Sequence, residues 1–384
     1  MASRTTHPVI GTRSLNRATL ARQLLLGRAG MSARDAVGHL LGLQAQNVKP
    51  PYYQLHARLA GFRPAELAGL MESREVVRMV TMRSTIHTHT AHDALTLRPL
   101  VQPARDREVG HFRKGLVGVD LERLTARARA FVEAGPPRTM GEIREELHTQ
   151  WPGADPQSLA VAARCRLPLV QVTPRGVWGR SGQVRLTTLE NWVGSGNAAA
   201  SGKAAGSGKA ADAAVDDVVL RYLGGFGPAS VKDMQTWAGL TRLREAFERL
   251  RPRLVVFRDE SGAELFDLPD APRPDPDVPA PPRFLPEFDN LLLSHADRTR
   301  VIPAEAKGRN WAGNQAYRTL LLDGFLAGLW KADAGVLTVE LFAPASNAAK
   351  DEIVAEGELL LAAMEEGQRS PSGRWSVRFG SIHG

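Results

Sequence analysis

Hydrophobic side chains recur along the chain at two different spacings. From Leu15 to Leu25 apolar residues roughly follow the period of a helix, and Ser32 is a suitable N-cap for the next helical stretch. Further on, runs rich in valine, isoleucine and threonine are typical of strands. The first expected elements are helices over 14–26, 33–41, 52–59 and 64–71, then strands over 76–82 and 85–90. Short helices followed by a strand pair are the element order of a winged helix.

The same order of elements recurs twice more. The second round has expected helices over 121–133, 140–150 and 156–166, then strands over 169–173 and 176–178. The third has expected helices over 215–223, 228–237 and 241–250, then strands over 254–257 and 264–268. The turn signal Asp259-Glu260-Ser261-Gly262 joins this last pair as a hairpin. We therefore predict a helix-rich α+β fold with three tandem winged-helix units, a repetition of element order and not of sequence.

Changes in composition suggest where these units begin and end. Residues 194–211 are rich in glycine, alanine and serine, and we interpret them as a flexible linker. Residues 269–282 are dense in proline and predict an extended connector. Beyond it, strands are expected over 324–331, 336–342 and 374–379, with a helix over 350–364. The predicted organisation is three winged-helix units over 12–115, 116–193 and 212–270, the linker over 194–211, and a β-rich C-terminal cap over 271–384.

Composition and charge narrow the class of protein. The chain has 384 residues, of which 43% are hydrophobic, so it can build packed cores, yet it has no apolar run long enough to span a membrane. Its single cysteine, Cys165, excludes an internal disulfide and a cysteine-based metal cluster, and we expect an intracellular, cytoplasmic protein. A formal net charge of +8 favours polyanionic partners, nucleic acid first.

An apolar run ends at Leu43-Gln44-Ala45-Gln46, shortly before Pro50 and Pro51. Because proline cannot donate to a helix ladder, the helix is expected to stop near Gln44. In extended backbone the side chains of Gln44 and Gln46 can converge, and two amides can hold a water or the edge of a base. On local evidence alone, a solvated loop is the simpler interpretation of this pair.

Other catalytic chemistries find little support in the sequence. His87 and His89 are spaced to share one face of a strand, close to His92 and Asp93, but no further ligand spacing fits a metal site. Histidines hydrogen-bonded near a site are the expected arrangement. The chain has no Gly-x-Ser-x-Gly elbow, and its glycine cluster over 224–227 follows a helix instead of opening one. We expect neither a metal nor a cofactor.

Three widely separated blocks carry a family resemblance. They are Leu43-Gln44-Ala45-Gln46, Met82-Arg83-Ser84-Thr85-Ile86-His87, and the segment 285–298, which reads Leu-Pro-Glu-Phe-Asp-Asn-Leu-Leu-Leu-Ser-His-Ala-Asp-Arg. In this order and spacing the chain resembles the AlkZ-type bacterial DNA glycosylases of the tandem winged-helix family, from about residue 14 to residue 379. The resemblance implies three winged helices that form a concave DNA-binding surface, and a catalytic Gln-x-Gln element at Gln44 and Gln46.

The same resemblance implies a substrate class. Members of this branch remove bulky N7-alkylated purines from double-stranded DNA, unhook interstrand crosslinks, and often protect a bacterium that makes a genotoxin. The residue type agrees with this chemistry, because glutamine is no general base but can hold and align a water. An N7-alkylpurine is already cationic, so its glycosidic bond breaks to release a neutral base. We expect a monofunctional hydrolase that acts as a monomer on the bacterial chromosome.

Further residues are expected to support the site or to contact DNA. Asp289 is the candidate carboxylate near the sugar, although capping its own segment explains it equally well. The hairpin over 301–322 is a candidate for probing the minor groove, with a solvated loop as the alternative. The supporting set also includes Arg83, His87, His295, Arg298, Lys307, Arg309 and Arg318. The alternative interpretation of the whole chain is a non-catalytic winged-helix regulator that recognises a DNA sequence.

Overall fold

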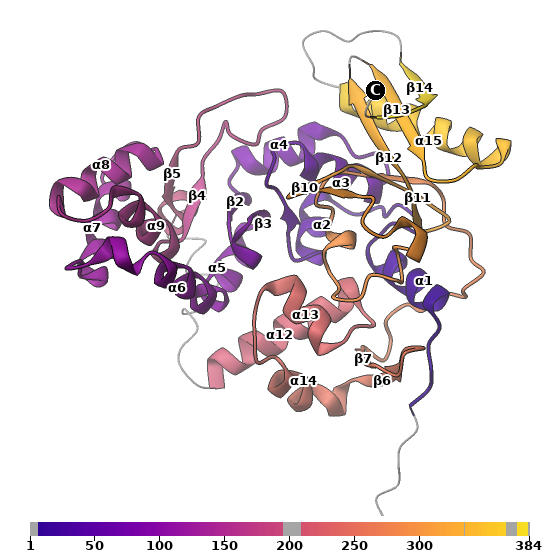
Figure 1. Ribbon diagram of the computed structural model, residues 1–384, viewed down its shortest axis with the longest axis horizontal. Helices are drawn as coiled ribbons and strands as arrows, with labels where there is room; N and C mark the ends of the chain where they lie inside the picture. Colours follow the sequence, from indigo (N-terminus) through magenta and orange to yellow (C-terminus); the bar gives the residue numbers. More distant parts are fainter. Residues whose placement is uncertain (1–6, 195–208, 334, 366–374, 383–384) are drawn as a thin grey trace, which may run out of the picture.

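The computed structural model describes residues 7–194, 209–333, 335–365 and 375–382, and these form a helix-rich α+β fold (Figure 1). The predicted fold class is confirmed at this level. The tandem winged-helix organisation and the predicted unit boundaries stay predictions. Among the described residues, no helix is long and apolar enough to cross a membrane.

Four short helices open the chain close to their predicted positions. They are α1 (Thr12–Arg22), α2 (Ala33–His39), α3 (Pro50–Arg58) and α4 (Pro64–Glu72). Ser32 caps α2 as predicted, and its hydroxyl accepts a hydrogen bond from the backbone amide of Asp35 at 3.1 Å. The first two helices end earlier than predicted, because the apolar pattern continues into the turns that follow them.

A turn separates α2 from the segment that carries Gln44 and Gln46, residues 43–46, called here the Gln44 segment. The helix was expected to stop near Gln44, but it already ends at His39, because Leu41 and Gly42 adopt φ angles of 54° and 100°. Backbone in this left-handed region cannot continue a helix. A Cβ atom on Gly42 would lie 2.2 Å from Nδ1 of His89, so the turn also requires glycine for close packing.

A five-stranded sheet receives the chain after this turn. Its strands are β1 (Leu43–Gln44), β2 (Val76–Val80), β3 (Ile86–Thr90), β4 (Leu169–Gln171) and β5 (Leu186–Thr188). Their order across the sheet is β1-β3-β2-β4-β5, and all neighbours are antiparallel. The strand pair β2–β3 was predicted. The sheet also joins the strands of the first two predicted units, since β2 pairs with β4.

The predicted strand over 176–178 is wrong. The partner of β4 within its own region is β5, and residues 172–185 form a loop between them. Val177 is buried in the same core as Tyr52, and the Tyr52 hydroxyl donates to the carbonyl of Gly176 at 2.7 Å. This loop therefore packs against the first region, an arrangement that its local sequence does not indicate.

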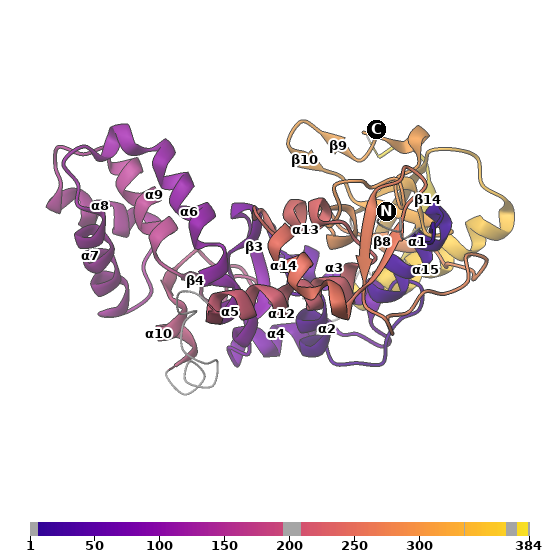
Figure 2. The same cartoon turned by 90° about the horizontal axis from the view of Figure 1, so that it is seen from below.

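The second helical region lies at one end of the molecule (Figures 1 and 2). Its helices α7 (Leu121–Glu133), α8 (Met140–Gln150) and α9 (Pro156–Arg166) have the predicted bounds. The pattern missed three helices around them, α5 (Ala91–Leu100), α6 (Gln102–His111) and α10 (Leu189–Val193). Helix α5 carries Pro99 near its end, and proline ordinarily argues against a helix interior.

The third region contains α12 (Lys209–Phe226), α13 (Val231–Ala238), α14 (Arg244–Leu250) and the hairpin β6 (Val255–Arg258) and β7 (Glu264–Asp267). The hairpin was predicted. Helix α13 begins three residues later than predicted, because Ser230 is its N-cap and exchanges hydrogen bonds with Asp233. Most of the predicted linker over 194–211 lies outside the described residues, and its last residues belong to α12.

The C-terminal region is a second five-stranded sheet. Its strands are β8 (Arg283–Leu285), β11 (Thr319–Leu322), β12 (Phe325–Asp333), β13 (Val336–Leu341) and β14 (Ser376–Phe379), in the order β14-β13-β12-β11-β8. Helix α15 (Asn347–Glu365) packs against it. This region is not separate from the first, because Tyr53 of α3 contacts Trp330 of β12, with ring centroids 5.6 Å apart.

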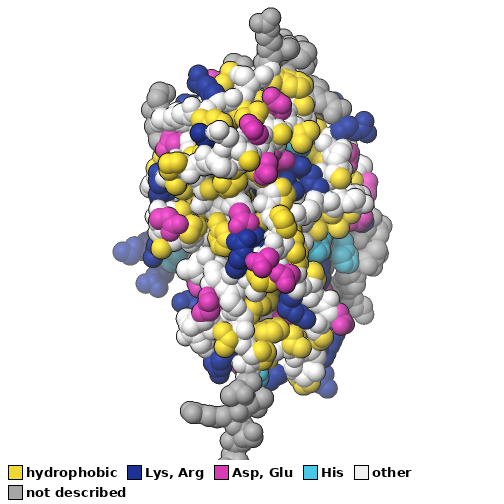
Figure 3. Space-filling view, turned by 90° about the vertical axis from the view of Figure 1, so that its right-hand side faces the viewer, with side chains coloured by type: hydrophobic (Ala, Val, Ile, Leu, Met, Phe, Trp, Pro, Cys, Tyr) yellow, Lys and Arg dark blue, Asp and Glu magenta, His cyan; other side chains and the backbone are white. Residues whose placement is uncertain are grey.

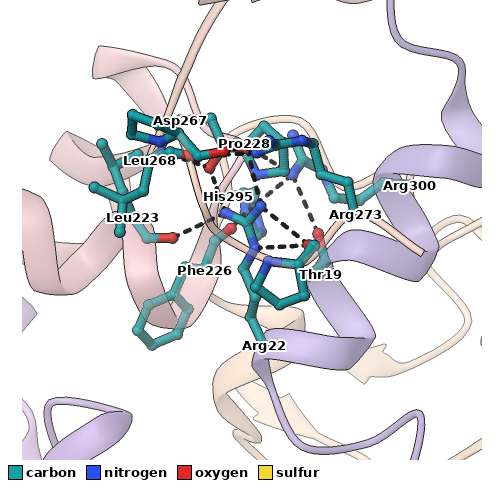
Figure 4. Close-up of polar contacts among 12 residues, drawn as sticks. Thr19, Arg22, Leu223, Phe226, Pro228, Asp267, Leu268, Arg273, His295 and Arg300 are labelled. Atoms are coloured by element: carbon teal, nitrogen blue, oxygen red, sulfur yellow. Dashed lines mark hydrogen bonds and ion pairs between the residues drawn. The ribbon is translucent and has the colours of Figure 1, made fainter. Parts of the chain in front are cut away.

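A buried polar network joins the first and third regions (Figure 4). Arg22 of α1 forms a bidentate ion pair with Asp267 of β7, with N–O distances of 2.5 and 2.9 Å, and neither side chain is exposed. Arg273 also contacts Asp267 at 2.6 Å. Buried guanidinium groups need this compensation, because an unpaired charge in the interior is strongly unfavourable.

We predict that Asp267→Ala lowers the free energy of unfolding by about 3–5 kcal/mol, because it leaves Arg22 buried without its counter-charge. Urea denaturation followed by circular dichroism measures this loss. The matched control is Glu75→Ala, which removes the exposed ion pair of Arg34 with Glu75 and should cost far less. Equal losses in the two variants would contradict the assigned role of the buried pair.

Candidate active site

The two glutamines lie where β1 ends at the edge of the first sheet. Gln44 pairs with His87 of β3, and the sheet hydrogen bonding continues one residue further, from the Ala45 amide to the Ile86 carbonyl at 2.8 Å. Gln44 is the last residue of the strand and Gln46 stands in a bend two residues later, so the convergence of their side chains stays a prediction. Gln44 is buried, whereas Gln46 is exposed and accepts a 3.4 Å hydrogen bond from the Ile86 amide.

Arg83 brings its guanidinium group to the side chain of Gln44. It stands in a 3₁₀ turn, η1 (Met82–Ser84), between β2 and β3. Its Nη2 lies 2.6 Å from Oε1 of Gln44 and 3.4 Å from Nε2 of His87. Its Nη1 donates to the carbonyl of Trp237 in α13. Two of the predicted supporting residues, Arg83 and His87, therefore do lie beside Gln44.

The protonation state of His87 follows from its two contacts. Its Nδ1 lies 3.1 Å from the carbonyl oxygen of Thr85, which can only accept, so Nδ1 carries the hydrogen. Its Nε2 is then the acceptor that faces Arg83. Complete burial, reinforced by the charge of Arg83, holds the pKa of His87 well below its usual range. His87 is thus a neutral imidazole whose single lone pair points at an arginine, which excludes it as an acid at neutral pH.

The block over 285–298 supports the Gln44 segment from the other side. The side-chain amide of Asn290 donates to the carbonyl of Gly42 at 2.7 Å, and its oxygen accepts from the amide of Gln44 at 3.4 Å. It thus occupies the place that a neighbouring strand would take. Gln54 of α3 completes the support by donating to the Gln44 carbonyl at 3.0 Å.

Asp289 faces away from solvent and is fully engaged by other groups. Arg58 of α3 binds both carboxylate oxygens at 2.8 Å, and neither side chain of this pair is exposed. One oxygen also accepts from the Leu291 amide and so caps a 3₁₀ turn, η4 (Asn290–Leu292). This geometry holds the neighbouring Asn290 in place. Its described partners are Arg58 and the backbone, and a catalytic role for Asp289 stays a prediction.

A second carboxylate, Glu287, connects the Gln segment to the candidate hairpin. Its two oxygens accept from Asn47 and from Arg318, each at 3.0 Å. Arg318 is half-buried and stacks on the rings of Tyr53 and Trp330, so its charge is directed inward. No role was predicted for Glu287, although it stands in one of the three blocks that carry the family resemblance.

The predicted hairpin exists between residues 301 and 322. Its strands are β9 (Trp311–Ala312) and β10 (Gln315–Ala316), and it extends beyond the neighbouring elements in Figure 2. Trp311 contacts Phe288 with ring centroids 5.7 Å apart, which anchors the hairpin beside the Gln segment. Lys307 and Arg309 are exposed on the approach to it, and Arg309 stacks on Phe342 at 3.8 Å.

His295 and Arg298, which were both predicted to support the site, lie in different parts of the structure. Nε2 of His295 donates to the carbonyl of Phe226 at 2.9 Å within the buried network of Figure 4, next to Arg300. His295 therefore belongs to the packing between the first and third regions. Arg298 is half-buried, and its charge, after burial itself, contributes to lowering the pKa of Arg83 to about 10. It is the residue of this pair that lies near the Gln44 site.

Several residues of the site were not predicted. Arg58 and Gln54 give no signal in the sequence, because an amphipathic helix carries many such polar positions. Arg78 of β2 is buried and donates to the Ala45 carbonyl at 3.0 Å, and burial lowers its pKa to about 10. Asn290 lies beside the predicted Asp289, so the quoted block could have indicated it. Among the described residues, no group of three potential ligands could hold a metal ion.

Basic and acidic side chains are interspersed on the side of the molecule that lies at the right in Figure 1 (Figure 3). The positive charges that the structure brings close to the two glutamines are Arg78, Arg83 and Arg298. The two amides can hydrogen-bond to a water or a polar group. Among the residues that the structure describes, the contacts of their oxygens are with Arg83 and with the Ile86 amide, and neither is an acid at neutral pH.

Comparison with known proteins agrees with this geometry. A family model described as DNA glycosylase AlkZ-like matches residues 37–363. The solved structure of Streptomyces sahachiroi DNA glycosylase AlkZ is similar in fold, with a TM-score of 0.74 and 20% sequence identity, over 97% of this chain and 100% of that chain. A search of curated proteins finds no match.

The buried histidines predict how stability depends on pH. Burial lowers the pKa of His295 and His56 to about 3 and that of His89 to about 4, against about 6.5 in an unfolded chain. Below pH 6.5 the unfolded state therefore binds more protons, and stability should fall as the pH falls, by up to about 1.4 kcal/mol per pH unit for each histidine. Urea denaturation at pH 7.5, 6.5 and 5.5 measures this slope.

The variant His295→Gln should make this pH dependence shallower, because its amide can still donate to Phe226 but does not titrate. The matched control is His92→Gln at an exposed histidine, which should leave the slope unchanged. A slope that is the same in all three proteins would contradict a neutral, buried His295.

Proposed function

Since the chain belongs to the AlkZ-like DNA glycosylase family, and is thus an enzyme that acts on DNA, we propose that its substrates are bulky cationic N7-alkylpurines. Family membership removes the support for a purely regulatory DNA-binding protein. The observation that carries the proposal is the polar surroundings of the two glutamines. Their side chains contact an arginine and a backbone amide, neither of which can protonate a leaving base.

The mechanism follows from that limitation. An ordinary purine must gain a proton to leave as a neutral base, and His87 cannot supply it because its pKa is far too low. A purine alkylated at N7 already carries the positive charge, so cleavage of its N9–C1′ bond releases a neutral base. The protein then needs to position water for attack at C1′ and to tolerate an oxocarbenium-like sugar. The Gln44 and Gln46 amides serve the first need. The water oxygen bonds to C1′, its extra proton passes to bulk water, and an abasic site is the product.

The proposed mode of DNA binding rests on the hairpin and the predicted winged helices. Residues 312–315 at the hairpin tip are exposed, small or polar, and uncharged, which suits a narrow groove. A probe of this kind does not require a bulky adduct to be swung fully into a closed pocket. This supports action on interstrand crosslinks as well as on monoadducts. We place the protein in the cytoplasm as a monomer acting on chromosomal DNA, in repair or in self-resistance to a genotoxin.

We predict that Gln44→Ala and Gln46→Ala each lower single-turnover release of N7-alkylguanine from duplex DNA by about 100-fold, because each removes a preorganised hydrogen bond. Released base is measured by chromatography, and duplex affinity is measured separately by fluorescence anisotropy and should persist. Gln150→Ala, at an exposed glutamine of α8, is the matched control and should behave as wild type. Undiminished release by the double variant would refute the assignment of the catalytic amides.

Substrate charge gives a second expected outcome. Uracil and hypoxanthine are uncharged and depend on an acid to leave, so duplexes that contain them should show no strand cleavage after alkali treatment. N7-methylguanine in the same sequence context should be released. The two substrates are compared at one enzyme concentration over the same time course, and efficient uracil release would overturn the proposed mechanism.

A further inference from the structure

The contact between Arg83 and Gln44 settles which end of the Gln44 amide faces outward. A guanidinium group has only donors, so the atom of Gln44 that lies 2.6 Å from Nη2 must be the carbonyl oxygen. The amide NH₂ is then the end left for a water or a substrate. The second amide differs, because Gln46 is exposed and its oxygen has only a 3.4 Å contact with a backbone amide.

The environment of Arg83 indicates that its position, and not its charge, is what the site uses. A cation would repel a cationic purine and an oxocarbenium-like sugar, which opposes catalysis. The described contacts of this guanidinium are internal, to Gln44, His87 and the carbonyl of Trp237. His87 reinforces the arrangement, since its Nδ1–H is committed to Thr85 and its lone pair faces Arg83.

The backbone at Arg83 is held in an uncommon conformation by the third region. Arg83 and Ser84 have successive φ angles of 52° and 58°, which non-glycine residues rarely adopt and which cost free energy. Gly239, the C-cap residue of α13, packs directly against this turn. A Cβ atom on Gly239 would lie 3.0 Å from the Arg83 amide nitrogen and 3.1 Å from its Cα. Such strain persists only where the surrounding structure enforces it.

We propose that Arg83 is a positioning residue, held by Gly239 and Trp237, that orients the Gln44 amide so that its NH₂ group faces the reacting water or sugar. Gln44 then acts as a donor, and Gln46 is left as the acceptor. This inference rests on the proposed glycosylase reaction and assigns different roles to the two glutamines. It also makes the third region a structural component of the active site.

A double-mutant cycle tests the proposal. If Arg83 acts through Gln44, then Arg83→Met and Gln44→Ala each slow single-turnover release of N7-methylguanine by about 100-fold, and the double variant is no slower than either. Independent contributions would instead multiply to about 10⁴-fold and overturn the proposal. Duplex affinity should stay unchanged in all variants, because the loss is in the chemical step. Weaker binding to undamaged duplex with a smaller salt dependence would identify Arg83 as a phosphate contact instead.

The orientation of the amide is tested by Gln44→Glu. This variant keeps an oxygen toward Arg83 and replaces the NH₂ donor by a second oxygen, so it should be as slow as Gln44→Ala. If the amide instead presented its oxygen to the reaction, Gln44→Glu would keep most of the activity and refute the proposed orientation. Circular dichroism and thermal unfolding confirm that each variant is folded, and Arg83→Ala replaces Arg83→Met if the latter is not.

Two glycine variants test the position of Arg83 separately from its charge, because they leave every side chain of the site unchanged. Gly239→Ala presses on the Arg83 backbone and should slow release, whereas Gly262→Ala at a β-turn has a similar positive φ, 85° against 70°, and no neighbour within 4 Å. Gly262→Ala therefore controls for backbone strain alone and should release base at the wild-type rate. Equal rates for the two glycine variants would contradict the role of Gly239.

The experiments distinguish failure of the proposed function from failure of this inference. If the wild-type protein releases no N7-methylguanine, the proposed function fails. If the wild type is active but the effects of Arg83→Met and Gln44→Ala multiply, this inference alone is refuted.

Discussion

The side-chain amide of Asn290 completes the hydrogen bonding of a strand only two residues long, and the candidate site depends on it. Strand β1 has β3 on one side, and on the other Asn290 binds the Gly42 carbonyl and the Gln44 amide. A strand this short has few ladder hydrogen bonds of its own with which to define its position. Asn290 is in turn held by the turn that Asp289 caps, and Asp289 is held by Arg58. The position of the Gln44 amide is thus set from a segment more than two hundred residues away.

The charged side chains around the two glutamines are a second feature of the candidate site. Arginines approach the Gln segment from β2, from the turn before β3 and from the block over 285–298, and the histidine among them is neutral. Such surroundings disfavour acid catalysis. They favour hydrogen bonding by amide side chains, which does not depend on pH near neutrality. The two carboxylates closest in sequence to Asn290, Glu287 and Asp289, are each paired with an arginine. The negative charge of these two carboxylates is therefore directed into the fold. In the proposed mechanism, DNA phosphates are another source of negative charge for the sugar.

Local sequence predicted most elements where one face is buried and a cap is present. Helices α7, α8 and α9 have clear N-caps at Asp120, Thr139 and Asp155, and their predicted bounds match the structure. Prediction failed where long-range packing decides the conformation. The segment around Gly176 was predicted as a strand, but it packs in the core beside Tyr52. Helix α2 ends well before Gln44, because the turn at Gly42 packs closely against His89. Neither constraint is visible within a window of ten residues.

The sequence by itself determined the α+β class, the order of most elements, and the family, since three separated blocks in a fixed order are specific even when each alone is not. It also determined the kind of chemistry available, because glutamine side chains do not ionise. The tertiary structure alone decided which end of the Gln44 amide contacts Arg83, that His87 is neutral, and that His295 lies in a buried packing network. The physical reason is that hydrogen-bond direction and protonation depend on partners brought together by folding, which no spacing along the chain specifies.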